Sequence, residues 1–77
     1  MNLYGRFEEN GYRIEAFIPD NADEPLEWTI KAYKENGLVK EIKVPMIHEP
    51  IFGVDVDDLR TLEDETDELM KSLPKIL

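Results

Sequence analysis

The single histidine of this chain is the first residue whose chemistry could matter. His48 stands beside Glu49 in the turn-rich segment 45–53, and a histidine next to a carboxylate can act as a general base or as a metal ligand. An imidazole base needs a nucleophile, and a metal site needs at least two further ligands. The chain has no second histidine and no cysteine to supply them. We therefore predict no catalytic residue and no metal site at His48.

Two acidic runs, 55–58 and 63–65, could offer oxygen ligands to calcium. An EF-hand loop that began at Asp55 would need an oxygen ligand at Leu59 and a glycine at Arg60, so the spacing does not fit. A capped helix with a solvated acidic face explains these residues better, with weak binding of a divalent ion as the open alternative. We predict no cofactor and no metal.

Nucleophiles and phosphate-binding loops are also missing. Ser72 is the only serine and lacks the strand-to-helix elbow that presents nucleophilic serines. The absence of cysteine excludes disulfides, thiolate zinc sites and thiol nucleophiles. All four glycines are isolated, so none belongs to a glycine-rich phosphate loop. We expect that the protein is not an enzyme.

The elements that position these residues begin with a hairpin around Asn10-Gly11. This dipeptide suits the positive φ angles of a type I′ turn, and two alternating runs flank it. A two-residue loop sets the register and brings opposite charges together. The expected pairs are Leu3–Ile18, Gly5–Ala16 and Phe7–Ile14 on one face, and Tyr4–Phe17, Arg6–Glu15 and Glu8–Arg13 on the other.

A second hairpin lies around Asn36-Gly37, but with a different register. A two-residue loop there would mix apolar and charged residues on both faces, so we predict a three-residue loop, 35–37, with Gly37 in the left-handed conformation. The expected pairs are Leu26–Met46, Trp28–Val44, Ile30–Ile42, Lys31–Glu41 and Tyr33–Val39. The proline-rich segment 19–25 between the hairpins predicts a surface loop.

From residue 55 the apolar period changes to that of a helix. Residues 59, 62, 66, 69 and 73 recur at steps of three and four. Asp55 is the predicted N-cap, Val54 and Leu59 form a hydrophobic staple, and Pro74 ends the helix. Segment 55–73 contains eight acidic and two basic residues, a net charge of −6 out of −9 for the whole chain.

Together these elements predict an α+β domain, a four-stranded antiparallel β-meander of two hairpins with one C-terminal amphipathic α-helix on one face (ββββα). Residues 1–77 form one small domain, because a chain of 77 residues is too short for two. The predicted strands are 2–9, 12–18, 26–34 and 38–46, followed by the linker 47–54 and the helix 55–73. The sheet face under the helix is expected to be formed by Leu3, Phe7, Ile14, Ile18, Trp28, Ile30, Ile42 and Val44.

The other sheet face carries aromatic side chains. Tyr4, Phe17 and Tyr33 are expected to point away from the helix. The aliphatic stems of neighbouring charged side chains could cover these rings, or the rings could form an interface. On so small a domain an open face or edge strand predicts a homodimer or a contact with another protein.

The charge limits the classes of partner. A net charge of −9 repels nucleic-acid phosphates and anionic lipid surfaces, so we expect no direct binding of nucleic acid or membrane and a preference for basic proteins. No run approaches the roughly 18 apolar residues of a membrane span, and no basic segment precedes an apolar run at the N-terminus. A cytoplasmic location is therefore expected.

These observations predict a non-enzymatic interaction or regulatory module without specifying its role. The expected partner-binding residues are Asp57, Asp64, Glu65 and Glu68 on the helix, with Tyr4, Phe17 and Tyr33 on the sheet. One alternative is an acidic mimic or inhibitor of a nucleic-acid-binding protein, in which the four carboxylates imitate phosphates. Another is a small enzyme or ligand-binding protein with a site shared between subunits near His48, Glu49 and Trp28.

Overall fold

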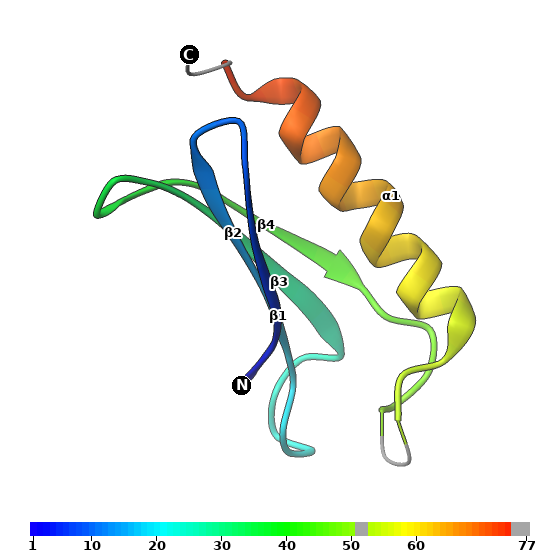
Figure 1. The fold of residues 1–77 in the computed structure, drawn as a ribbon. Coiled ribbons are helices and arrows are strands. Elements are labelled where there is room, and N and C mark those ends of the chain that lie inside the picture. Colours follow the sequence, from blue (N-terminus) through cyan, green and yellow to red (C-terminus); the bar gives the residue numbers. More distant parts are fainter. Residues whose placement is uncertain (51–52, 75–77) are drawn as a thin grey trace.

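A computed structural model describes residues 1–50 and 53–74 of the chain. Within them, one antiparallel sheet with the strand order β1-β2-β3-β4 is followed by a single C-terminal helix, α1 (Figure 1). The predicted ββββα architecture is confirmed. The elements are β1 (Asn2–Glu9), β2 (Tyr12–Ile18), β3 (Glu27–Lys34), β4 (Gly37–Pro45) and α1 (Val56–Ser72).

The first hairpin turns at Asn10 and Gly11, as predicted. Both residues have positive φ angles, 53° and 85°, which a type I′ turn requires at its two central positions. The register near the turn is also the predicted one. The confirmed pairs are Gly5–Ala16, Arg6–Glu15, Phe7–Ile14 and Glu8–Arg13.

A β-bulge at Tyr4 changes the pairing at the start of β1. Leu3 lies opposite Phe17 and Asn2 lies opposite Ile18, so the predicted pairs Leu3–Ile18 and Tyr4–Phe17 are wrong. A bulge places two residues of one strand against one of the other, and a one-residue shift moves side chains to the opposite face. Leu3 therefore leaves the core face and is 50% exposed.

The second hairpin reaches the predicted register by a different turn. Lys34 lies opposite Gly37, so the loop consists of Glu35 and Asn36 alone. Glu35 has the positive φ of 58°, and the prediction of a left-handed Gly37 is wrong. The pairs Trp28–Val44, Ile30–Ile42 and Lys31–Glu41 are confirmed.

A second bulge, at Val39, reconciles the tight turn with that register. Tyr33 lies opposite Leu38 rather than Val39, as a result of the shift between Ala32 and Tyr33. Past the end of the ladder the backbone N–H of Met46 donates to the carbonyl of Leu26 (3.0 Å), which keeps these two residues adjacent as expected. The bulge absorbs one residue, so the apolar residues of β4 stay on the core face.

Helix α1 begins and ends within one residue of its predicted bounds. Asp55 is the N-cap, and its side chain accepts the backbone N–H of Asp57 (2.9 Å). At the other end Leu73 is extended, as expected for a residue before proline. In the described part of the chain, residues 1–50 and 53–74, no helix has both the length and the apolarity to cross a membrane.

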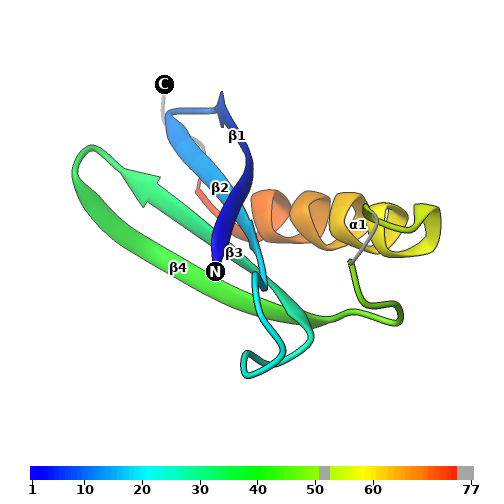
Figure 2. The same ribbon diagram turned by 90° about the horizontal axis from the view of Figure 1, so that it is seen from below.

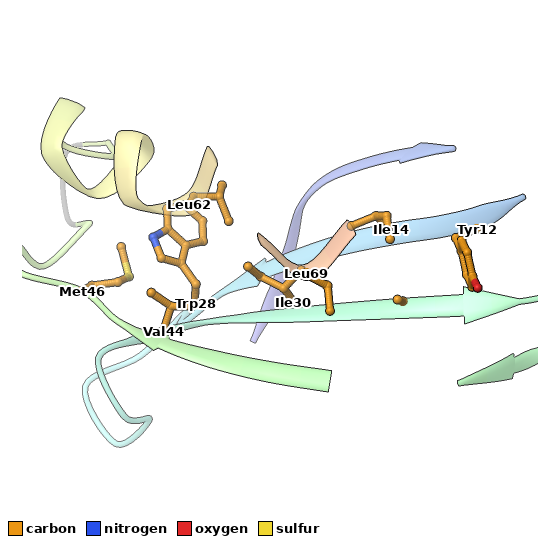
Figure 3. Close-up of a cluster of buried hydrophobic side chains, with 9 residues drawn as sticks. Tyr12, Ile14, Trp28, Ile30, Val44, Met46, Leu62 and Leu69 are labelled. Carbon is orange, nitrogen blue, oxygen red and sulfur yellow. The ribbon is translucent and has the colours of Figure 1, made fainter. Parts of the chain in front are cut away.

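The core lies between α1 and the face of the sheet that carries Trp28 and Ile30 (Figure 3). Both side chains are fully buried, and Leu62 and Leu69 of the helix pack against the same cluster. Val54 and Leu59, the expected staple, also pack on it. Figure 2 shows that α1 runs along one face of the sheet only. Phe7 is 43% exposed, so β1 contributes less to the core than predicted.

Candidate functional site

The acidic residues of α1 form the first candidate site, because the burial of Leu62 and Leu69 directs the opposite side of the helix to solvent. Asp57, Asp64 and Glu68 are exposed, whereas Glu65 is half-buried at the border of the packed side. We call these four residues the acidic face. Glu68 has a cation nearby, Lys71, whose Nζ lies 3.7 Å from a Glu68 carboxylate oxygen.

The N-terminal end of α1 is fixed to the domain by an aspartate that the sequence reasoning did not single out. Asp58 is fully buried, and its two carboxylate oxygens accept the backbone N–H groups of Ile47 (2.7 Å) and His48 (2.9 Å). Its carbonyl oxygen accepts the indole N–H of Trp28 (3.1 Å). A signal existed, because Asp58 precedes Leu62 by four residues and therefore lies on the apolar side of the helix. One residue thus connects the helix, the sheet and the segment after β4.

The C-terminal end of α1 is fixed by two further hydrogen bonds. The hydroxyl of Tyr12, a 5% exposed residue of β2, donates to the carbonyl of Pro74 (2.6 Å). The ammonium of Lys40 in β4 donates to the hydroxyl of Ser72 (3.2 Å). The helix is therefore held at both ends, which gives the acidic face a fixed orientation on the domain.

His48 has acidic neighbours at the N-terminus of the helix. Its Nε2 atom lies 3.7 Å from Oδ1 of Asp55, and ligand atoms of His48, Asp55 and Asp57 lie within 4.8 Å of one another. All three side chains are exposed, and the positive end of the helix dipole opposes a cation there. Ser72 lies at the other end of the helix, about 25 Å away at 1.5 Å per residue over 17 residues. The fold therefore does not bring the only serine to the only histidine.

The aromatic residues expected on the outer sheet face do not form one apolar patch. Because of the bulge, the ring of Tyr4 packs edge-on against Trp28, with ring centroids 5.0 Å apart, instead of pairing with Phe17. The expectation of a Tyr4–Phe17 pair on this face is thus corrected. Phe17 and Tyr33 are half-buried on the outer face.

Cations cover the rings of Phe17 and Tyr33. The Lys31 ammonium lies 5.2 Å from the centre of the Phe17 ring, and the Arg13 guanidinium lies 4.6 Å from that of Tyr33. Such cation–π contacts contribute about 0.5–1 kcal/mol at exposed sites. The outer face thus presents charged groups rather than bare rings.

The Met1 amine and Asp20, a residue of the loop before β3, have shifted pKa values. A Glu24 carboxylate oxygen accepts a hydrogen bond from the Met1 amine (2.7 Å), and this contact raises the pKa of the amine. The pKa of Asp20 is lowered, chiefly by a side-chain hydrogen bond with Glu24. Both shifted groups lie outside the acidic face.

Comparison with known proteins adds no family to this description. Searches of protein-family models, of curated proteins and of solved structures gave no match to the chain.

Proposed function

We propose that this protein is a non-enzymatic interaction or regulatory module that binds a basic protein partner through the acidic face of α1. The observation that carries this proposal is that the helix combines a large negative charge with a fixed position on the sheet. Segment 55–73 supplies −6 of the net charge of −9, and hydrogen bonds at Asp58 and Pro74 hold the helix on the sheet. A fixed charged face loses less conformational entropy on binding than a flexible acidic tail.

The electrostatics favour a cationic partner. Six of the eight acidic residues in segment 55–73 are exposed, whereas Asp58 is buried and Glu65 is half-buried. Exposed carboxylates of one sign steer an oppositely charged protein and speed its association, and added salt weakens that effect. We place this interaction in the cytoplasm, a location that cell fractionation tests separately.

A matched pair of neutralised variants tests the proposal. The first carries Asp57→Asn, Asp64→Asn, Glu65→Gln and Glu68→Gln in the acidic face. The control carries Glu9→Gln, Asp23→Asn, Glu35→Gln and Glu49→Gln, four exposed residues outside the helix. Both lose four negative charges, so they differ only in where the charge was.

Binding to a labelled arginine- and lysine-rich peptide is measured by fluorescence anisotropy across a salt series. The proposal predicts that the acidic-face variant binds at least tenfold more weakly than the control, and that added salt weakens binding to the unaltered protein. Equal affinities for the two variants would show that net charge alone attracts the peptide, and the acidic face would then have no special role.

A narrower form of the proposal is inhibition by mimicry of nucleic acid. In this form the acidic face occupies the phosphate-binding surface of a nucleic-acid-binding protein. The protein should then displace labelled DNA from a basic DNA-binding domain, and the acidic-face variant should not. Displacement by both variants, or by neither, would contradict mimicry.

A further inference from the structure

The outer face of the sheet carries two rows of alternating charge, one across all four strands and one across β1 and β2 only, and both rows stop at β1. Arg6 lies opposite Glu15, Glu15 opposite Lys31, and Lys31 opposite Glu41. This row therefore alternates in sign across all four strands. Lys31 Nζ lies 3.7 Å from a Glu41 carboxylate oxygen. At the β1 edge, none of the described strands lies beyond Arg6 to continue the alternation.

The neighbouring row has the opposite sign at the same edge. Glu8 lies opposite Arg13, and the Arg13 guanidinium covers the ring of Tyr33. The edge of β1 thus ends with a cation at Arg6 and an anion at Glu8 on one face. A strand that continued both rows would place an anion beside Arg6 and a cation beside Glu8.

The backbone of β1 offers hydrogen bonds at these same two residues. Glu9 and Tyr12 close a two-residue turn, and the closing pair of such a turn exchanges hydrogen bonds. Because hydrogen-bonded and non-hydrogen-bonded pairs alternate in an antiparallel ladder, the N–H and C=O groups of Arg6 and Glu8 point away from β2. β1 is an edge strand (Figure 2), so within residues 1–50 and 53–74 no further strand covers them.

The other edge of the sheet is less suited to pairing. β4 contains Lys40 and Lys43, a bulge at Val39 and a proline at its end. Lysine, proline and bulges on an edge strand are the devices by which proteins prevent strand addition. β1 has none of these between residues 5 and 9.

We propose that β1 pairs antiparallel with β1 of a second copy of this chain, with the twofold axis at Phe7. Arg6 then lies opposite the partner's Glu8, and Glu8 opposite the partner's Arg6. Both charge rows continue across the interface without a break in alternation. A twofold axis at Arg6 or at Glu8 would instead place like charges opposite each other, which destabilises a sheet. Among these three axes, charge therefore favours the one at Phe7.

The same register gives the exposed ring of Phe7 a partner. Phe7 is 43% exposed on the core side of β1. In the proposed dimer it forms a non-hydrogen-bonded pair with the partner's Phe7, the arrangement in which cross-strand side chains lie closest. The partner is thus identified as an identical chain by backbone hydrogen bonds, charge and an aromatic contact. The inference involves β1 alone and is separate from the acidic face of α1.

Sedimentation velocity with two charge-reversed variants tests this pairing. The unaltered protein should change from monomer to dimer as its concentration rises. Arg6→Glu gives two acidic residues at each contact of its own dimer, and Glu8→Arg gives two basic ones, so each variant alone should remain monomeric. An equimolar mixture pairs Glu with Arg at both contacts and should restore the dimer. Lys34→Glu and Asp23→Arg, at exposed positions outside β1, are controls that should dimerise normally.

The proposal is overturned if the unaltered chain stays monomeric at all concentrations, or if the dimer survives either charge reversal. It is also overturned if the mixture stays monomeric while circular dichroism shows that both variants are folded. Hydrogen exchange on the unaltered chain provides a check without substitution. The amides of Arg6 and Glu8 should become protected as concentration rises, and exchange that is independent of concentration would also overturn it. The neutralised acidic-face variant should dimerise normally, which distinguishes failure of this inference from failure of the proposed function.

Discussion

Replacement of Asp58 by alanine should be the most destabilising change in α1 that removes no apolar side chain. The substitution takes away both acceptors of the Ile47 and His48 amides, which lie 2.7 and 2.9 Å from the carboxylate oxygens. It leaves those N–H groups beside a cavity in a site where Asp58 is fully buried. The bond from Trp28 to the Asp58 carbonyl is a backbone contact and stays available.

The magnitude follows from the number and kind of bonds lost. A hydrogen bond to a charged group contributes about 1.5–3 kcal/mol, and a buried donor left without a partner costs about 1–3 kcal/mol. Water that enters the cavity would satisfy part of this loss, so we expect Asp58→Ala to lower the free energy of unfolding by about 3 kcal/mol. The total free energy of unfolding of a domain of 77 residues is roughly 4–12 kcal/mol. The change therefore removes a large share of the stability.

Urea denaturation followed by the fluorescence of Trp28 measures this effect. With a slope of about 1–2 kcal/mol per molar urea for a small protein, the midpoint should fall by about 1.5–3 M. Asp57→Ala is the matched control, because it removes the same charge from the same helical turn at an exposed position. It should cost less than about 1 kcal/mol, the usual effect of the helix dipole. If the two variants differed by less than about 1 kcal/mol, the anchoring role of Asp58 would be refuted.

Three further substitutions, one of them with an exposed control, test the capping and packing of the helix and the packing of β1. Asp55→Ala should lower the free energy of unfolding by about 1 kcal/mol in the same denaturation assay, because it removes the N-cap acceptor. Leu69→Ala should cost about 2–5 kcal/mol as a buried leucine, whereas Val56→Ala, at a position 64% exposed, should cost little. Tyr4→Ala should shift the emission of Trp28 to the red by opening the indole to water, and an unchanged spectrum would contradict the edge-on contact.

The regular elements could be predicted because their signals are local and repeated. Asn10-Gly11 specifies a tight turn through its φ angles, and the apolar steps from Leu59 to Leu73 specify one side of a helix. The helix bounds agree to one residue at each end. For the second hairpin, matching Trp28 and Ile30 to apolar partners gave the register although the turn itself was predicted wrongly.

The bulges could not be predicted because no local signal specifies them. A bulge at Tyr4 follows from packing, since it places the tyrosine ring against Trp28, a residue 24 positions later in the sequence. The same shift carries Leu3 to the outer face. At Val39 the bulge reconciles a two-residue turn with the apolar register of β4. Both bulges depend on contacts between strands. The alternation of apolar residues within one strand carries no information about those contacts.

The buried polar anchors were missed for a related reason. In the sequence, Asp58 belongs to an acidic run and Tyr12 belongs to an alternating strand, so neither residue is distinguished from its neighbours. Their partners, the amides after β4 and the Pro74 carbonyl, are backbone groups whose positions only the fold defines. These bonds give the acidic face its fixed orientation, so the binding proposal depends on them.

Hydrogen exchange at the amides of Ile47 and His48 tests the anchoring of α1 most directly. These residues follow β4 with exposed side chains, so an unanchored segment would exchange its amides at the rates of a free peptide. If Asp58 holds them, both amides should exchange orders of magnitude more slowly, and the protection should be lost in Asp58→Ala but kept in Asp57→Ala. Fast exchange of both amides in the unaltered protein would contradict the fixed orientation of the helix.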